Sequence, residues 1–347
     1  MPLKIYFNSK YKTNLLHTGV DRVAEAYKKY LSERYSVSEL RYSFNNKILK
    51  NIEEQVVLSR YKIAKNVIVI HPTNTAPIKK MNAYEILVIH DLAFLDYPQG
   101  FSELFRKWYK FLIPTILKSK DHIITVSNFT KRRIIEEYGI NDKKISVVRN
   151  GIWLPQNRKD SYNRVFKHFL AVGTLNARKN YLTIIRAHKA LPSDIRKKYP
   201  LRIVGGWEKN YRNENIKSLL DESIILEGYV SEERLSYLYQ NALAQISASK
   251  YEGFGLPVLE SISYNIIPIV SDIPAFREII GTDYPFIFNT ENEKELSRYM
   301  LIMAKNPLDI YNDPLIKNKF EEKLNLYNWE TTLRPLNNII NKQIKPE

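Results

Sequence analysis

Short apolar runs alternate with amphipathic stretches along much of the chain. Runs of four to seven residues rich in Val and Ile are typical of strands buried on both faces of a sheet. Amphipathic stretches with the helical period are typical of helices that cover such a sheet. In the first half, strands are predicted at 3–9, 66–72, 85–91, 121–127 and 144–150, and helices at 21–35 and 128–139, the second with Asn128 as its cap and Gly139 as its stop.

The same rhythm restarts after residue 165. Alternation of strand and helix predicts parallel sheets with helices on both faces. The predicted fold class is therefore α/β, with two doubly wound parallel sheets. In this half, strands are predicted at 168–173, 201–206, 223–230, 243–249, 266–272 and 285–289, and helices at 181–191, 231–242 and 256–265.

The polar stretch 153–164 separates the two series and is expected to be a linker. We expect an N-terminal domain over 1–155 and a C-terminal domain over 165–325. A helix within 326–347 is expected to pack back on the first domain. Ligands of doubly wound sheets bind outside the carboxyl ends of the strands, and a cleft between two such domains is a natural binding site.

The composition is that of an ordinary globular protein, with 44% hydrophobic and 26% charged residues among 347. No apolar run approaches the ~18–20 residues of a membrane-spanning helix. The first residues favour a strand over a secretory signal. The chain contains no cysteine, which excludes disulfides, thiol catalysis and Cys-ligated metals and fits a cytoplasmic location.

The formal net charge of +16 is unevenly distributed. Residues 1–150 contain 26 Lys and Arg against 14 Asp and Glu, whereas residues 151–347 contain 27 against 23. An excess of positive charge in one half indicates a polyanionic partner. Nucleic acid, an anionic membrane surface and a phosphorylated substrate all satisfy this condition, and part of the excess is also explained by a general bias towards lysine.

Several widespread motifs are missing from the sequence. It contains no GxGxxG, GxxxxGK[ST], HExxH or GxSxG, so the sequence offers no nicotinamide fingerprint, P-loop, zinc-protease site or nucleophile elbow. The six histidines do not have metal-ligand spacing. Asp-x-Asp, the carboxylate pair that commonly holds a sugar nucleotide through a divalent cation, is also missing, so no metal is expected.

The most specific segment runs from Glu252 to Glu260 and reads EGFGLPVLE. It follows a predicted strand and combines a glycine turn with the start of a helix, where Pro257 loses no hydrogen bond. The free N–H groups and the dipole of a helix start favour a phosphate. Two flanking carboxylates would accept hydrogen bonds from sugar or ribose hydroxyls. A charged loop followed by a Glu that suits the helix dipole is the simpler alternative.

Three further positions are candidates. Arg178 and Lys179 follow the strand 168–173 and together suit a diphosphate, although a solvated basic loop has the same sequence pattern. Gly19 would let a helix start approach a phosphate, or is an ordinary loop glycine. His90, at the end of the strand 85–91, points into a site or is a structural histidine.

In this order, these segments resemble the retaining glycosyltransferases of family 4, which have the GT-B fold of two facing Rossmann-like domains. The similarity is greatest to the bacterial mannosyltransferase-like branch, which builds O-antigen, capsule and related polysaccharides. It extends over nearly the whole chain and is carried by residues 90–102, 123–152, 172–188, 201–206, 225–242 and 246–261.

The resemblance implies catalytic roles for Glu252, His90, Arg178 and Lys179. It implies that Glu252 contacts the donor sugar and Glu260 the ribose. Arg178 and Lys179 would bind the diphosphate, and His90 would lie beside the sugar. The other donor-binding positions that it implies are Gly19, Gly173, Gly228, Tyr229, Val230, Phe254, Gly255 and Leu256.

Two positions depart from the family pattern. Thr174 follows Gly173 where many relatives carry Arg, so Arg178 and Lys179 are expected to hold the diphosphate alone. Asp21 and Arg22 stand where relatives often have Gly-Arg. The implied reaction transfers a hexose, with mannose favoured, from a nucleoside diphosphate sugar with retention of configuration and without a metal or other cofactor.

The expected acceptor is a saccharide or a polyprenyl-diphosphate-linked saccharide, presented by the N-terminal domain. Residues 101–120 form a basic amphipathic pattern that fits either a core-facing helix or a helix on an anionic membrane, on the inner face of the cytoplasmic membrane. A sugar-nucleotide epimerase of the same fold is the alternative enzyme. A basic nucleic-acid-binding protein is the remote alternative, although no nucleic-acid-binding module is recognised. The sequence indicates no oligomeric state.

Overall fold

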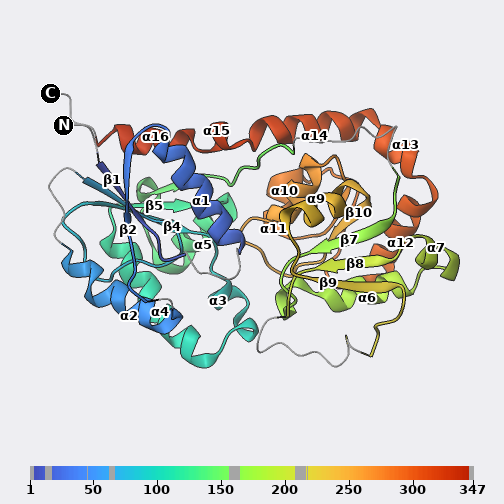
Figure 1. Cartoon of the computed structure of the whole chain (residues 1–347), viewed down its shortest axis with the longest axis horizontal. Coiled ribbons are helices and arrows are strands. Elements are labelled where there is room, and N and C mark those ends of the chain that lie inside the picture. Colours follow the sequence, from blue (N-terminus) through green and yellow to red (C-terminus); the bar gives the residue numbers. More distant parts are fainter. Residues whose placement is uncertain are drawn as a thin grey trace. The chain divides into compact units, whose positions relative to one another are not determined.

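The computed structural model describes residues 4–11, 18–44, 46–61, 67–155, 165–207, 216 and 218–343. The chain divides into two compact units. Unit 1 consists of Met1–Gly151 together with Trp329–Glu347, and unit 2 consists of Ile152–Asn328. Both units are built on a parallel sheet (Figure 1). Most of the predicted linker, residues 156–164, lies outside the described residues.

In its described part, unit 1 contains a six-stranded parallel sheet in the order β2-β1-β3-β4-β5-β6. The central strands are mostly apolar on both faces, with Glu85 of β4 and His71 of β3 as a buried polar pair, and β3 is buried along its whole length because helices cover the sheet on either side. The strands are β1 (Lys4–Asn8), β2 (Ser36–Leu40), β3 (Val67–His71), β4 (Tyr84–Ile89), β5 (His122–Thr125) and β6 (Ile145–Val147).

The helices of unit 1 begin and end at recognisable signals. Thr18 and Asp21 form a capping box at the start of α1. The predicted cap of α5, Asn128, is wrong by one residue: the hydroxyl of Ser127 accepts from the N–H of Thr130 and caps the helix, while Gly139 ends it in the left-handed conformation as predicted. The helices are α1 (Gly19–Ser32), α2 (Lys47–Val56), α3 (Ala93–Asp96), α4 (Glu103–Ser119), α5 (Asn128–Tyr138), α15 (Trp329–Thr332) and α16 (Arg334–Asn341).

The described part of unit 2 contains a second six-stranded parallel sheet, in the order β12-β11-β10-β7-β8-β9. Its strands are β7 (His168–Val172), β8 (Leu201–Val204), β9 (Ile224–Gly228), β10 (Ala242–Ser247), β11 (Pro268–Ser271) and β12 (Ile287–Phe288). Its helices are α6 (Tyr181–Lys189), α7 (Ser193–Lys198), α9 (Glu232–Gln240), α10 (Leu256–Ser263), α11 (Pro274–Ile280), α12 (Glu293–Lys305), α13 (Pro307–Asn312) and α14 (Pro314–Leu326).

The end of the chain returns to unit 1. Trp329 packs edge-on against Tyr27 of α1, with ring centroids 6.3 Å apart. It also lies so close to Gly151 that a Cβ atom there would come within 2.8 Å of the Trp329 ring and backbone, and only glycine fits. Arg34 adds an ion pair with Glu330 at 2.7 Å. Residues from both ends of the sequence therefore build one core.

The predicted α/β fold class is confirmed. The strands expected in both halves are present, although residues 3 and 66 of the expected ranges lie outside the described residues. One strand, β2, was not predicted. Its sequence SVSEL is mostly polar because β2 is the edge of the sheet and is only partly covered.

Candidate functional site

The centre of the candidate site is a carboxylate held between two cations in unit 2. Oε2 of Glu252 accepts a hydrogen bond of 2.7 Å from Nη1 of Arg178. Oε1 accepts bonds of 2.6 Å from Nζ of Lys179 and 2.8 Å from the hydroxyl of Ser249. Glu252 is buried, whereas the two cations keep part of their surface exposed. The structure thus brings together three residues that the sequence singled out in two separate motifs.

The topology explains why these motifs meet. β7 and β10 are neighbours in a parallel sheet, so the loops that follow them leave at the same edge. After β7, the side chain of Asn176 accepts a bond from the Lys179 N–H and shapes the short 3₁₀ helix Ala177–Lys179. Arg178 is tied to the other loop through the carbonyl of Tyr251 and the N–H of Lys250. Both cations are therefore positioned by backbone contacts.

The electrostatics of Glu252 are set by its two partners. Burial alone would raise the pKa of Glu252, but the charges of Arg178 and Lys179, with the hydrogen bonds from Lys179 and Ser249, hold it at about 2. The carboxylate is therefore ionised at neutral pH and can only accept hydrogen bonds. Each cation has donors beyond the single bond to this carboxylate, so both are suited to hold an anion at the same time.

The loop after β10 leads directly into α10. Gly255 precedes the helix with φ of 115°, and a Cβ atom there would lie 2.6 Å from the ring of Phe276. Both the backbone conformation and the space require glycine. Phe254 is buried edge-on against Tyr327, with ring centroids 5.8 Å apart, which fixes the loop. At the start of α10, Pro257 has no N–H and the N–H of Val258 donates to the carbonyl of Gly255 at 3.0 Å, so the N–H of Leu256 and the helix dipole are what this helix start offers to an anion.

The ends of β7, β8 and β9 form a second part of the same edge. The N–H of Gly173 donates to Val204, and the N–H of Gly205 donates to Gly228. The exposed ring of Tyr229 lies against Gly206, where a Cβ atom would come within 2.2 Å of the ring. Val230 packs on the core below. This glycine-lined edge, formed by residues 173, 205, 206 and 228, leaves backbone and an aromatic ring accessible.

Glu260 lies one turn into α10. Its Oε2 accepts a 2.9 Å hydrogen bond from the hydroxyl of Tyr239, whose ring stacks on Tyr264 with centroids 5.0 Å apart. Neither Tyr239 nor Ser249 was predicted as a site residue. Both are ordinary members of a helix and a strand end in the sequence, and only the folded arrangement brings them to the two carboxylates.

The two remaining predicted residues belong to unit 1. His90 is buried at the end of β4, and its Nε2 lies 2.7 Å from the carbonyl oxygen of Pro72. Because a carbonyl only accepts, Nε2 carries the proton of the ring. Burial lowers the pKa of His90, so the ring is neutral at pH 7. Gly19 is the first residue of α1, directly after the capping Thr18, and is exposed.

Two family models match consecutive parts of the chain. "Glycosyl transferases group 1" matches residues 155–321, and "Glycosyltransferase Family 4" matches residues 20–154. The chain belongs to glycosyltransferase family 4. The expected membership of this family is confirmed, and the site around Glu252 lies within the region matched by "Glycosyl transferases group 1".

Two curated relatives have informative names. The O-antigen chain mannosyltransferase RfbU of Salmonella typhimurium is 31% identical over 215 residues, covering 60% of this chain and 58% of the relative. O-antigen chain mannosyltransferase B of Escherichia coli is 28% identical, covering 56% of this chain and 55% of the relative. The chain thus matches less than two thirds of the length of these relatives.

The fold of this family-4 chain is shared with solved glycosyltransferases. The Anabaena protein HepE, crystallised with UDP-glucose, superposes with a TM-score of 0.72 at 12% identity, covering 98% of this chain and all of that one. At this identity the likeness concerns the fold. The two parallel sheets are those of the GT-B class.

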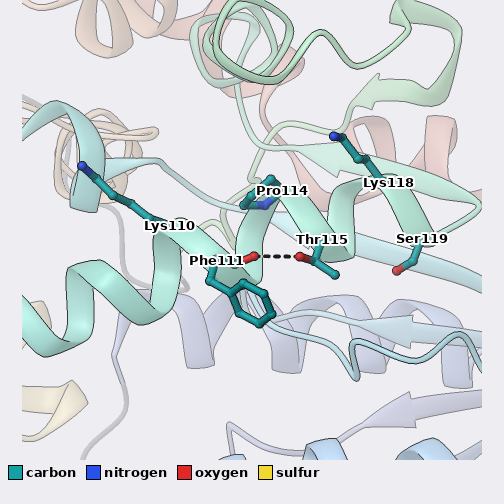
Figure 2. Close-up of a pocket in the computed structure, with 6 residues that line it drawn as sticks. All are labelled: Lys110, Phe111, Pro114, Thr115, Lys118 and Ser119. Atoms are coloured by element: carbon teal, nitrogen blue, oxygen red, sulfur yellow. Dashed lines mark hydrogen bonds between the residues drawn. The ribbon is translucent and has the colours of Figure 1, made fainter.

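Other features of the chain lie away from the carboxylate. Within the described residues, no three His, Asp or Glu side chains are grouped as a metal site would require. Over the same residues, no helix has the length and apolar content needed to cross a bilayer. A surface depression of about 560 Å³ lies on α4, where Lys110 and Lys118 extend to one side of the helix and Phe111 to the other (Figure 2). It contains none of the predicted site residues.

Proposed function

We propose that this family-4 chain transfers a hexose, with mannose favoured, from a nucleoside diphosphate sugar to a saccharide or lipid-linked acceptor in the synthesis of a cell-surface polysaccharide. The observation that carries the proposal is the ion-paired cluster of Glu252, Arg178 and Lys179 at the carboxyl edge of the unit 2 sheet. It combines a buried acceptor of hydroxyl hydrogen bonds with two fixed cations, which is the combination that a sugar diphosphate requires.

The proposed donor site follows the edge of this sheet. Arg178 and Lys179 would bind the diphosphate, assisted by the Leu256 N–H and the helix dipole at the start of α10. Glu260, oriented by Tyr239, would accept from the ribose, and the exposed edge at Gly228 and Tyr229 would support the base. The structural relative HepE was crystallised with UDP-glucose, and the names of the sequence relatives favour mannose.

The proposed chemistry is a front-face substitution with retention. The bond between the anomeric carbon and the diphosphate breaks while the acceptor oxygen bonds on the same face, and the acceptor proton passes to the leaving phosphate. Arg178 and Lys179 would stabilise the charge that develops on this phosphate. A double displacement needs a carboxylate free to attack. Both oxygens of Glu252 are already engaged by three donors, which favours a role in holding the sugar and the cations. No metal takes part in this proposal.

The acceptor side of the proposal rests on unit 1. The neutral ring of His90 donates from Nε2 to Pro72, which leaves Nδ1 as a hydrogen-bond acceptor for a sugar hydroxyl. The two curated relatives are named for O-antigen chains, so a saccharide on a polyprenyl diphosphate is the acceptor class that we favour. A cytoplasmic enzyme acting on such an acceptor has to reach the membrane surface.

Peripheral membrane association is therefore part of the proposal. The sequence pointed to residues 101–120. In α4, the residues Leu112, Ile113 and Ile116 pack into the core, while Leu104 and Phe111 remain exposed. The core-facing reading of this helix thus accounts for most of its apolar residues. The part of α4 that could contact a membrane is therefore limited to the exposed Leu104 and Phe111 and the neighbouring Lys107 and Lys110.

A two-stage experiment tests the proposed function. First, thermal unfolding is followed with a panel of sugar nucleotides, because a donor at one hundred times its Kd adds about 2.7 kcal/mol to stability. Then the stabilising donor is incubated with candidate acceptors, and NMR establishes whether the product keeps the anomeric configuration. Stabilisation by none of the donors would contradict the proposal. Release of a free, modified sugar without an acceptor would indicate an epimerase instead.

A further inference from the structure

Helix α2 has its polarity inverted relative to an ordinary surface helix. Its two acidic residues, Glu53 and Glu54, are buried, whereas Ile52 and Val56 are exposed by 53% and 47%. Leu49 is 41% exposed, and Val57, which directly follows the helix, is 52% exposed. A surface helix normally buries its apolar side and exposes its charges. The combination of buried acids and exposed aliphatic residues is therefore the informative observation.

The buried acids of α2 are fully partnered within unit 1. Glu53 accepts from the backbone N–H groups of Ser43 and Phe44, at 2.8 and 3.4 Å. Glu54 is ion-paired with Lys10 and accepts at 3.2 Å from both Asn8 and Thr75. These contacts fix the rotation of the helix about its axis. The aliphatic side chains consequently point outward as a stable feature of the fold.

The exposed side chains form one continuous stripe. Leu49, Ile52 and Val56 are spaced by three and four residues, so they share one face of the helix. Beyond the end of α2, Val57 and Tyr61 are further exposed hydrophobic residues, at 52% and 50%. We call this set the α2 stripe. An exposed apolar stripe of this kind marks an interaction site, since soluble proteins otherwise avoid it.

The charge around the α2 stripe selects the kind of partner. Between residues 46 and 61 the acids are the buried Glu53 and Glu54, and among the basic side chains that the structure describes in this range, Lys50 is buried and Arg60 is exposed. Exposed Lys79 follows Ile78, whose N–H donates to Gln55 of α2. Unit 1 as a whole contains 29 Lys and Arg against 16 Asp and Glu, whereas unit 2 contains 24 against 21. An apolar stripe within a basic surface is complementary to an anionic bilayer.

We infer that the α2 stripe inserts into the interface of an anionic membrane and is the main element by which unit 1 docks there. α2 lies at the periphery of unit 1 (blue in Figure 1), where Glu54 accepts from Asn8 at the end of β1 and from Thr75 after β3. This inference rests on the proposed membrane association and not on the proposed transfer reaction. It adds an element that the sequence pattern of residues 101–120 did not indicate.

The absence of cysteine from the sequence permits a direct test in the full chain. Ile52→Cys is labelled with the environment-sensitive dye NBD and mixed with vesicles of equal parts phosphatidylglycerol and phosphatidylcholine. We expect a blue shift and a rise in emission, and a smaller response with pure phosphatidylcholine. Leu315→Cys is the matched control, because Leu315 is 77% exposed in unit 2. An unshifted dye at position 52 on protein that sediments with the vesicles would overturn the inference.

A second pair of variants measures the contribution of the stripe. Ile52→Ser with Val56→Ser should weaken sedimentation with the anionic vesicles about tenfold or more. Leu308→Ser with Leu315→Ser removes similar exposed side chains from unit 2 and should not change it. Equal binding by both double variants would overturn the inference. So would a dimer, detected by light scattering, that only the α2 variant dissociates, because the stripe would then be a contact between two copies. Transfer to a soluble acceptor, measured in parallel, separates this result from a failure of the proposed reaction.

Discussion

Nη1 of Arg178 lies 2.7 Å from Oε2 of Glu252, although 73 other residues separate the two along the chain. The same Nη1 also donates to the carbonyl of Tyr251 at 3.0 Å. The guanidinium therefore holds the loop after β10 and the carboxylate at once. Lys179 donates to the second carboxylate oxygen, so the two cations fix the carboxylate from both of its oxygens.

Removal of either cation should impair turnover. Arg178→Ala and Lys179→Ala each take away a fixed positive charge aimed at the leaving diphosphate, and we expect turnover to fall about 10²-fold or more. Steady-state kinetics with the stabilising donor measure this. Lys189→Ala is a suitable control, because Lys189 pairs with Asp221 elsewhere in unit 2. Near-normal turnover in both site variants would remove these residues from the mechanism.

The depressed pKa of Glu252 predicts how stability depends on pH. The folded value is about 2 against an ordinary value of 4.5, so the ion pairs contribute stability that is fully present above about pH 4.5 and lost as the pH falls towards 2. The difference between the wild type and Glu252→Gln should be about 3 kcal/mol at pH 7. Urea unfolding of both proteins at pH 7, 5 and 3 tests this. A difference that does not shrink in acid would contradict it.

Gly255 should tolerate no side chain. Gly255→Ala forces a positive φ on alanine and drives its Cβ into Phe276, so we expect a loss of stability above the about 1–2 kcal/mol that the backbone conformation alone costs. Gly139→Ala provides the comparison, because Gly139 also has positive φ but nothing lies within 4 Å of its Cβ position. Thermal unfolding should rank Gly255→Ala as clearly the less stable. Equal values for the two would show that the Phe276 contact relaxes freely.

The hydrogen bond between Tyr239 and Glu260 predicts a change in donor affinity. Tyr239→Phe keeps the stack on Tyr264 but removes the hydroxyl that orients the carboxylate, which is worth about 1 kcal/mol. We expect a roughly fivefold rise in the KM for the donor with little change in kcat. Tyr237 lies on the same helix as Tyr239, and its hydroxyl accepts a hydrogen bond from Lys167. Tyr237→Phe should therefore leave both KM and kcat unchanged. A fall in kcat alone would place Glu260 outside donor binding.

Removal of divalent metals should not affect the reaction. The sequence lacks Asp-x-Asp, and we expect Arg178 and Lys179 to neutralise the diphosphate in place of a cation. Turnover measured in EDTA should therefore equal turnover in added Mg²⁺ or Mn²⁺. Loss of activity in EDTA that manganese restores would require a different account of the leaving group.

The elements that the sequence predicted are those whose burial produces a regular apolar pattern along the chain. Val and Ile runs identified the central strands because a strand covered on both faces is apolar along most of its length. The strand β2 was not predicted, because SVSEL lies at the edge of its sheet and has several polar residues. α2 was not expected either, and its inverted polarity places acids where a core-facing pattern would have aliphatic residues.

The candidate site was predictable in composition but not in its contacts. The glycine turn before Leu256 and the basic pair at 178–179 are short-range patterns that a sequence displays directly. That Glu252 would bind both cations was not apparent, because their strands become neighbours only when β10 inserts beside β7. Ser249 and Tyr239 contribute single hydroxyls, which leave no pattern in the sequence at all.

The packing of Trp329 against Gly151 and Tyr27 has a consequence for biosynthesis. Residues up to Gly151 of unit 1 are translated before unit 2, but the core of unit 1 lacks Trp329 and the buried Leu333 and Leu336 until all of unit 2 has been translated. Unit 2, which is encoded between them, is complete earlier. The core of unit 1 can therefore close only after the whole of unit 2 has been synthesised.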